Sequence, residues 1–418
     1  MKGPMPRVEF FAARGKLVAG REQTVDVLIR VVPPELEAAS QRPRLNLCVV
    51  LDRSGSMQGL KMARAREAAS YCVDQLLPTD RLSVVIFDDR VDVLIPSRPA
   101  DDKEGMKRLL SRVGARDSTA LHEAWVRGGM QVSEHLDHEA VNRVLLITDG
   151  LANVGLTNTD EIVSQAAGLQ RRGVSTSTVG IGEDFNEDLL MPMAQGAGGN
   201  AWHVSEPGDL RRIFEVELEG LVAQFAHTVS LGLVPADGVR IGDVLNDFEL
   251  TETGRYKLPN LQSGSPLEVV VSLRVPARGP GTRLRLLDAR LGLTPQDGRA
   301  REVIRDFFEV EFAPESEVEA LREDERVTKA VRLLMNARAR REAVSYMDAG
   351  DYAAASSSVL VACAASAASP ACDDPELARD AEDLEGLSLL LADRGSDKMS
   401  RKLLSYGSLL RRTGRKVK

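Results

Sequence analysis

The chain has 418 residues, of which 43% are apolar and 28% are charged. This length indicates two or three folded domains, and this composition argues against a mainly disordered chain. The formal net charge of -8 is modest for the size. General electrostatic attraction to nucleic acids or to anionic membranes is therefore not expected.

The N-terminal sequence MKGPMPRVEFFAARGK has prolines and charges where a secretory signal requires an unbroken apolar stretch. No window reaches the roughly 18 apolar residues of a membrane span. We therefore expect a cytosolic protein. Its four cysteines show neither a CxxC pair nor zinc-ligand spacing, so we expect reduced core residues. They are Cys48, Cys72, Cys363 and Cys372.

Two strand-like segments lie within the first 42 residues, from Val8 to Ala12 and from Thr24 to Val32. Two strands alone are marginal in water, so they need partners. Later segments with alternating apolar residues supply these partners: LEVVVSLRV, RLRLLDARLGL and FFEVEF. We therefore predict one antiparallel β-sandwich domain, built from residues 1–42 and 225–313 on both sides of an insertion.

The predicted insertion, residues 43–224, alternates short apolar runs with helical segments. The runs are LNLCVVL, RLSVVIF, VDVLI, NRVLLIT and VSTSTVGIG, and the helical segments cover about 58–77, 101–112, 119–136, 158–172, 186–196 and 207–224. This pattern is typical of an α/β fold with a doubly wound, mostly parallel sheet covered by helices on both faces. Because VDVLI follows the preceding run after a few residues, we expect it to be an antiparallel edge strand.

Residues 314–418 have the composition of a helical region, for which we predict four helices. Asp374 is placed to cap a helix that begins at Pro375, and Gly395 to end it. The segment 343–367 resembles one tetratricopeptide-like hairpin, but no repeat of about 34 residues supports a full array. The basic tail RKLLSYGSLLRRTGRKVK is either a solvated helix face or a binding site for an anionic partner.

A group of oxygen-bearing side chains follows two of the predicted strands. Asp52, Ser54 and Ser56 come directly after LNLCVVL, in the sequence LDRSGSM, and Asp149 follows a second run in LLITDG. The loop GARDSTALHEAW adds Thr119 just before a helix. Ligands of open α/β sheets bind at the carboxyl ends of the strands. These hard oxygen donors suit Mg²⁺ better than zinc or copper.

The five residues in this order resemble the metal-ion-dependent adhesion site (MIDAS) of the von Willebrand factor type A (VWA) domain family. The resemblance covers about residues 43–224 and includes TDGLANVGLTNTDEI, STVGIGEDFNEDLL and GAGGNAWHV. It implies a Rossmann-like VWA fold and a metal held directly or through water, with Mn²⁺ or Ca²⁺ as alternatives to Mg²⁺. The implied ligands are Asp52, Ser54, Ser56, Thr119 and Asp149.

The resemblance also implies a partner protein, since a Glu or Asp of the partner usually completes the metal coordination in this family. Two carboxylates only neutralise a divalent cation, so the metal would still attract an external carboxylate. We therefore expect a metal-dependent protein–protein interaction module rather than an enzyme. Relatives inside cells suggest a cytosolic scaffold or regulator, and the Ala and Arg richness is similar to that of bacterial chains.

Several alternatives remain open at this stage. The sequence DRSGSM could be only a capped turn between strand and helix, with Ser56 near the helix N-terminus. Asp117 could add a carboxylate that weakens the attraction for an acidic partner. A Mg²⁺-dependent phosphatase of the haloacid dehalogenase type also places an aspartate after its first strand, but it needs an acid where this chain has Ser54. A structural scaffold acting mainly through its helices is the third functional class.

Other motifs give weaker predictions. GSMQGLKM lacks the GK[ST] ending of a phosphate-binding loop, and neither GIGED nor GAGGN completes GxGxxG. We expect His135 and His138 to be a surface pair rather than metal ligands, because a third ligand is missing. Trp125 and Trp202 are expected to be packing residues. Nucleic-acid binding is not expected, with the basic tail as the one feature that would favour it.

Overall fold

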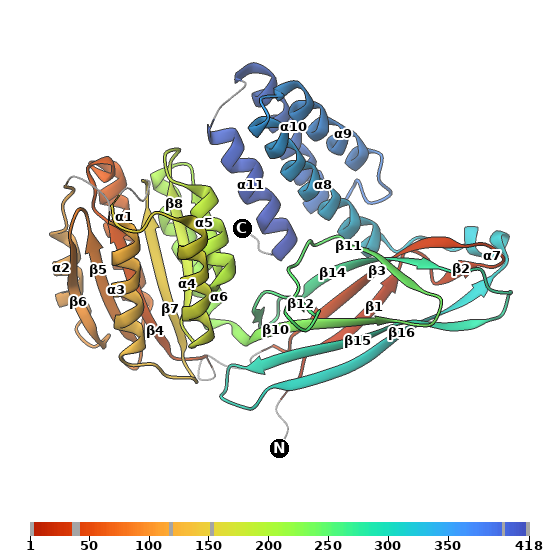
Figure 1. The fold of residues 1–418 in the computed structure, drawn as a ribbon, viewed down its shortest axis with the longest axis horizontal. Coiled ribbons are helices and arrows are strands. Elements are labelled where there is room, and N and C mark those ends of the chain that lie inside the picture. Colours follow the sequence, from red (N-terminus) through yellow and green to blue (C-terminus); the bar gives the residue numbers. More distant parts are fainter. Residues whose placement is uncertain (1–3, 36–41, 117–119, 151–153, 395–397, 415–418) are drawn as a thin grey trace. The chain divides into compact units, whose positions relative to one another are not determined.

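The computed structural model describes residues 4–35, 42–116, 120–150, 154–394 and 398–414 (Figure 1). The chain divides into two compact units. One consists of Met1–Glu35, Phe225–Pro295 and Ala300–Lys416, and the other mainly of Leu36–Gln224 together with Gln296–Arg299.

The second unit is a six-stranded α/β sheet with the order β6-β5-β4-β7-β8-β9. Its strands are β4 (Leu45–Asp52), β5 (Arg81–Phe87), β6 (Val91–Pro99), β7 (Val141–Thr148), β8 (Ser175–Ile181) and β9 (Gly198–Val204). All residues of β4 and β7 are buried, as expected of central strands covered on both faces. Strands β5, β4, β7, β8 and β9 pair in parallel, each with the next. Strand β6 pairs antiparallel with β5, which confirms the predicted edge strand.

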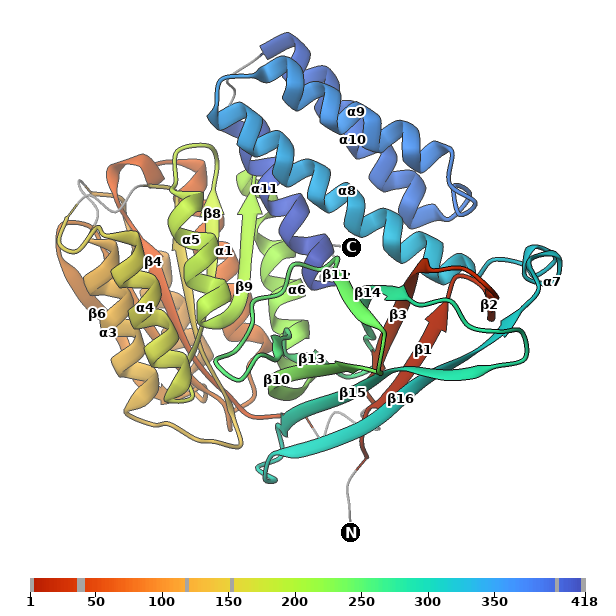
Figure 2. The same ribbon diagram turned by 45° about the vertical axis from the view of Figure 1, so that its right-hand side comes forward.

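Within the described residues, six α-helices cover this sheet. They are α1 (Leu60–Gln75), α2 (Lys103–Ser111), α3 (Leu121–Ser133), α4 (Thr159–Arg171), α5 (Glu187–Gly196) and α6 (Leu210–Val222). Helices α1, α2 and α6 lie on one face, and α3, α4 and α5 on the other (Figures 1 and 2). Short 3₁₀ turns precede α1 at Gly55–Met57 and α6 at Pro207–Asp209. The predicted doubly wound α/β fold is therefore confirmed.

The edge strand β9 was not predicted as a strand. It begins with Gly198 and Gly199, which have low strand propensity and hide the signal. The close approach of the neighbouring strand explains the second glycine, because a Cβ atom on Gly199 would lie 1.9 Å from the carbonyl oxygen of Thr176.

A buried polar cluster fixes helix α6 to the sheet. The Glu217 carboxylate on α6 accepts hydrogen bonds from Ser177 Oγ (2.6 Å), Asn200 Nδ2 (2.7 Å) and Trp202 Nε1 (2.8 Å). It also lies 3.8 Å from Nη1 of Arg143, whose side chain is 3% exposed. Burial lowers the pKa of Arg143, and Glu217 opposes this shift. Trp202 is thus buried, as predicted for both tryptophans, but it also anchors this cluster.

The first unit contains two β-sheets. One has the order β1-β3-β14-β11, and the other the order β12-β10-β15-β16-β2, with β13 paired to β10. Their strands are β1 (Arg7–Ala12), β2 (Lys16–Val18), β3 (Gln23–Val32), β10 (Gln224–Pro235), β11 (Arg240–Val244), β12 (Tyr256–Lys257), β13 (Leu261–Gln262), β14 (Leu267–Val275), β15 (Arg283–Pro295) and β16 (Glu302–Ala313).

The N-terminal strands do pair with strands that follow the α/β unit. Strand β3 lies antiparallel between β1 and β14. The rings of Phe10 on β1 and Phe308 on β16 stack 5.8 Å apart and so join the two sheets. The unpredicted strand β2 pairs in parallel with β16, so the arrangement is antiparallel except at this edge.

Helix α8 covers the other face of the β3–β14 sheet. The C-terminal helices are α7 (Glu315–Glu319), α8 (Glu325–Asp348), α9 (Tyr352–Ala367), α10 (Pro375–Arg394) and α11 (Lys398–Thr413). Leu28 and Val270 on the sheet pack with Val327, Ala330 and Leu334 on α8. This contact explains why β14 contains three consecutive buried valines, since both faces of the strand are covered.

The helical hairpin α8–α9 has the form suggested by the sequence, with Gly350 at φ 79° between the helices. Asp374 caps α10 by accepting hydrogen bonds from the backbone N–H groups of Glu376 (2.9 Å) and Leu377 (3.2 Å). The predicted stop at Gly395 lies outside the described residues.

Two interpretations of the C-terminal region need correction. Arg401 and Arg411 of α11 are neither simply solvated nor free for an anionic partner, because Arg401 pairs with Asp348 and Arg411 pairs with Asp380 and Glu376. The second correction concerns the cysteines, which are all free thiols as predicted, although they are not all core residues. Cys48 and Cys72 are buried, Cys363 is half-buried, and Cys372 is exposed.

Among the described residues, the helices all fall short of the length and apolar character needed to cross a membrane.

Candidate metal centre

The turn after β4 is built around Asp52, the last residue of that strand. Its Oδ1 atom accepts a hydrogen bond from the backbone N–H of Ser54 at 2.8 Å, which closes a tight turn. Gly55–Met57 then form one 3₁₀ turn, and Gly59 with φ 81° leads into α1. This left-handed conformation favours glycine at position 59. The serine side chains are thereby left free to point toward the neighbouring strand end.

Asp149 belongs to the same cluster, because parallel pairing brings the carboxyl ends of β4 and β7 together. Ser54 Oγ and Ser56 Oγ lie 3.1 Å apart, and Ser56 Oγ donates to Asp149 Oδ1 at 2.7 Å. Thr148 Oγ1 donates to Asp52 Oδ2 at 2.5 Å. The structure therefore joins four of the five predicted site residues. The backbone N–H of Ser54 links it to Asp52, and hydroxyl contacts link Ser54 to Ser56 and Ser56 to Asp149.

Both carboxylates are fully buried, with 0% of Asp52 and Asp149 exposed, whereas Ser56 is exposed. Burial raises the pKa of Asp52 to about 6, although the hydrogen bonds from Thr148 and Ser54 act in the opposite direction. The nearby Asp149 charge contributes to the same increase. A buried pair of carboxylates beside an exposed hydroxyl is an arrangement that a cation would stabilise.

Lys61 on α1 supplies a cation to this cluster. Its Nζ atom donates to Asp149 Oδ2 at 2.5 Å, and its side chain is 27% exposed. The two oxygens of Asp149 thus have different partners, a serine hydroxyl on one side and an ammonium group on the other. In the sequence, Lys61 stands out only as the lysine of GSMQGLKM, an incomplete phosphate-binding motif.

The residues on either side of Thr119 lie next to the same region. Asp117 and Thr119 themselves lie outside the described residues. On either side of them, the backbone N–H of Arg116 donates to the carbonyl of Arg53 at 2.6 Å, and that of Ala120 donates to the carbonyl of Asp88 at 2.7 Å. Both ends of the loop are therefore fixed next to the Asp52 turn and the end of β5.

The interpretation of DRSGSM as a simple helix cap is wrong. The residue before α1 is Gly59, and neither it nor Ser54 before the 3₁₀ turn makes a side-chain capping bond. The hydroxyl of Ser56 is committed to Asp149 instead. Thr148 was not predicted to belong to the cluster, although its position directly before Asp149 in the sequence could have indicated it.

The donor set fits a small, hard cation. Two carboxylates and two serine hydroxyls offer only oxygen atoms, which Mg²⁺, Mn²⁺ and Ca²⁺ prefer. Over the part of the chain that the structure describes, no group of three or more His, Cys, Asp or Glu side chains could hold a metal. A site of this kind therefore depends on hydroxyl groups as well as carboxylates.

Several known proteins are similar in sequence to part of this chain. A protein of Synechocystis sp. named sll0103 is 28% identical over 198 residues, covering 47% of this chain and 46% of that protein. The inter alpha-trypsin inhibitor, heavy chain 4, of Mus musculus is 27% identical over 262 residues, covering 59% of this chain and 26% of that protein. The chain thus spans less than half the length of these curated relatives.

Two solved structures share the fold. The von Willebrand factor type A protein from Catenulispora acidiphila superposes with a TM-score of 0.70 at 18% identity, and 97% of each chain is covered. The ArnB paralog VWA2 from Sulfolobus acidocaldarius gives a TM-score of 0.56 at 18% identity, with 97% of this chain and 99% of that chain covered. The family model of the von Willebrand factor type A domain matches residues 46–216. This α/β unit, which carries Asp52 and Asp149, is a von Willebrand factor type A domain.

Proposed function

We propose that this chain is a metal-dependent protein-recognition module whose VWA domain binds an acidic residue of a partner through a divalent cation. Asp52, Ser54, Ser56 and Asp149 would hold the metal, together with Thr119 from the loop between Arg116 and Ala120. The bound metal would supply a Lewis-acidic site for a carboxylate. We further propose, from the sequence alone, that the protein acts in the cytosol as a scaffold or regulator.

One observation carries this proposal. Four of the five residues of the metal-binding pattern meet in one cluster, in which two fully buried carboxylates share a chain of hydroxyl contacts. VWA domains typically mediate protein–protein interactions, which supports the same function. Mg²⁺ is the proposed metal because all the donors are oxygens and because two carboxylates suffice for its charge.

The chemistry of the cluster gives less support to an enzyme of the haloacid dehalogenase type. That mechanism needs an acid two residues after the first aspartate, where this chain has Ser54, whose backbone N–H binds Asp52. The hydroxyls and Lys61 are engaged in holding the two carboxylates. Recognition of a partner carboxylate therefore uses the residues present, whereas hydrolysis requires a proton donor from elsewhere.

Metal binding is tested by titrating the full chain with MgCl₂ and MnCl₂ in a calorimeter. Asp52→Asn and Asp149→Asn should each weaken binding by about 100-fold or more, since even residues around the ligands contribute about 10- to 100-fold. Asp74→Asn, at an exposed position at the end of α1, removes the same charge and should leave binding unchanged. Unchanged binding in both site variants would mean that the metal site is wrongly assigned.

Partner recognition is tested separately by affinity capture with the full chain in MgCl₂ or in EDTA, with mass spectrometry of the proteins retained. The proposal expects at least one protein that is lost both in EDTA and with Asp149→Asn. A set of partners that is identical in all three conditions would contradict metal-dependent recognition and favour a scaffold that acts through its helical region.

A further inference from the structure

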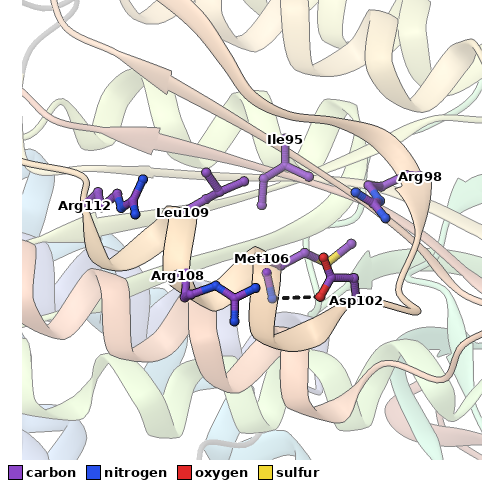
Figure 3. Close-up of a pocket in the computed structure, with 8 residues that line it drawn as sticks. Ile95, Arg98, Asp102, Met106, Arg108, Leu109 and Arg112 are labelled. Carbon is purple, nitrogen blue, oxygen red and sulfur yellow. Dashed lines mark hydrogen bonds between the residues drawn. The ribbon is translucent and has the colours of Figure 1, made fainter.

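The VWA domain has a pocket between strand β6 and helix α2, away from the metal-binding cluster proposed above (Figure 3). Its volume is about 260 Å³, which suits one or two side chains rather than a larger ligand. The pocket is lined by Ile95, Arg98, Asp102, Gly105, Met106, Arg108, Leu109 and Arg112. Figure 3 shows the apolar side chains between Arg98 on one side and Arg112 on the other.

The charges of this pocket are mostly positive and only partly compensated. The one acid among the lining residues, Asp102, caps α2 by accepting the backbone N–H of Gly105 at 2.9 Å. Arg98 makes one weak, exposed ion pair with Asp101 at 3.4 Å. Arg108 and Arg112 have no side-chain hydrogen bond or ion pair with any residue that the structure describes. Two guanidinium groups are therefore available to a ligand.

The lysines of the same helix behave differently. Lys103 Nζ donates to the carbonyl of Asp74 at 2.8 Å, and Lys107 pairs with Asp74 and Glu104. The two lysines thus attach α2 to α1, whereas the arginines face the pocket. Arg108 and Arg112 are four residues apart, and like charges at this spacing cost a helix about 0.2–0.5 kcal/mol. Both arginines lie at the C-terminal end of α2, where positive charge also interacts favourably with the helix dipole.

The floor of the pocket is apolar. Ile95 and Met106 are buried, and Leu109 is 38% exposed. A bound strand is not favoured here, because Pro96 on the edge strand β6 lacks the N–H group that pairing requires. A ligand would therefore be held by its side chains, with aliphatic atoms on the floor and anionic groups on the guanidinium groups.

We propose that this pocket binds an acidic peptide segment of a partner protein, with an aliphatic side chain over Leu109 and flanking carboxylates on Arg108 and Arg112. The net charge of the whole chain is -8, so the protein as a whole would repel an acidic segment. The two unpaired arginines would attract it locally. The site is separate from the metal centre, because Ile95 pairs with Val84 in the middle of β5, whereas Asp52 pairs with Phe87 at its end.

This separation makes the two proposals distinguishable. Binding to the arginine pocket should persist in EDTA and with Asp149→Asn, whereas recognition at the metal centre should be lost in both. The probe is a fluorescein-labelled acetyl-Glu-Glu-Leu-Glu-Glu-amide peptide, titrated with the full chain in EDTA and followed by fluorescence anisotropy. A peptide with Gln in place of each Glu tests the role of the carboxylates.

We expect Arg108→Gln/Arg112→Gln to weaken binding of the acidic peptide by about tenfold or more, because two charge-assisted contacts are lost. Arg171→Gln/Arg172→Gln removes the same charge from two exposed residues at the end of α4 and should bind like wild type. Equal weakening in both variants would show diffuse electrostatic attraction and overturn the pocket. Absence of binding at millimolar peptide, or competition by equimolar inorganic phosphate, would also overturn it.

Discussion

Replacing Lys61 with methionine should make the VWA domain bind Mg²⁺ more tightly. Methionine has a similar length but carries no charge and cannot donate to Asp149. In the wild-type protein a metal at the proposed site would have to compete with the Lys61 ammonium for Asp149 Oδ2, which lies 2.5 Å from Nζ. In the variant this competitor is absent, so the carboxylate is available without breaking an ion pair.

The size of the effect follows from the exposure of the two groups. Asp149 is fully buried, and the Lys61 side chain is 27% exposed, so solvent screens the pair only in part. A hydrogen bond between charged groups contributes about 1.5–3 kcal/mol. Since about 1.4 kcal/mol corresponds to a factor of ten, the affinity for Mg²⁺ should rise by roughly 10- to 100-fold. The free energy of unfolding in EDTA should fall by a similar amount, because Asp149 loses its cation.

Calorimetric titration with MgCl₂ and urea unfolding in EDTA measure these two changes. Lys107→Met is the matched control, because it removes a lysine from an exposed ion pair on α2 and should alter both quantities little. A Lys61→Met variant with unchanged or weaker Mg²⁺ affinity would refute the idea that Lys61 competes with the metal. A gain in affinity without loss of stability in EDTA would refute the proposed role of the ion pair.

Three further predictions concern the rest of the chain. Glu217→Ala should lower the free energy of unfolding by about 3–5 kcal/mol, because it leaves Arg143 buried without its ion-pair partner. Urea titration measures this, and a decrease in the free energy of unfolding below about 1 kcal/mol would contradict it. The affinity for Mg²⁺ should fall about tenfold per pH unit below pH 6, since a protonated Asp52 cannot bind the metal. Calorimetry at pH 7 and pH 5 tests this, and equal affinities would contradict a metal ligand at Asp52 with a pKa of about 6. Deletion of residues 1–35 should expose the edge of β14 and cause aggregation in size-exclusion chromatography; a monomeric, folded product would contradict the pairing.

The α/β sheet could be predicted because its central strands are continuous apolar runs bounded by turns. Strands β4, β5 and β7 each correspond to one such run, whereas β8 begins with the polar residues STST before its apolar end. Strand β9 could not be predicted, because packing against Thr176 requires Gly199 and glycine weakens the sequence pattern of a strand. Strand β2 has only three residues, too few for a periodic pattern. The proposed segment boundaries at 42, 224 and 313 remain predictions.

The contact between α8 and the β3–β14 sheet could not be read from the sequence. Val270 stands among three consecutive valines, which indicate burial on both faces of β14 but do not say what covers the second face. The ion pairs of α11 were missed for a similar reason. The sequence shows that Arg411 is basic, whereas only the fold shows Asp380 beside it.

The sequence could predict the proposed metal centre as a group of oxygen-bearing side chains, but it could not predict the charge balance of that group. The sequence supplies two carboxylates, which would neutralise a divalent cation and give a neutral site. The structure adds Lys61 to this count, so the proposed site without metal carries one net negative charge, and with a divalent cation one net positive charge. A partner carboxylate would then restore neutrality, provided that Lys61 stays near the cluster after it leaves Asp149. Lys61 would therefore oppose metal binding but favour an acidic ligand once the metal is bound, and for this reason Lys61→Met should gain affinity for Mg²⁺ while losing affinity for the partner.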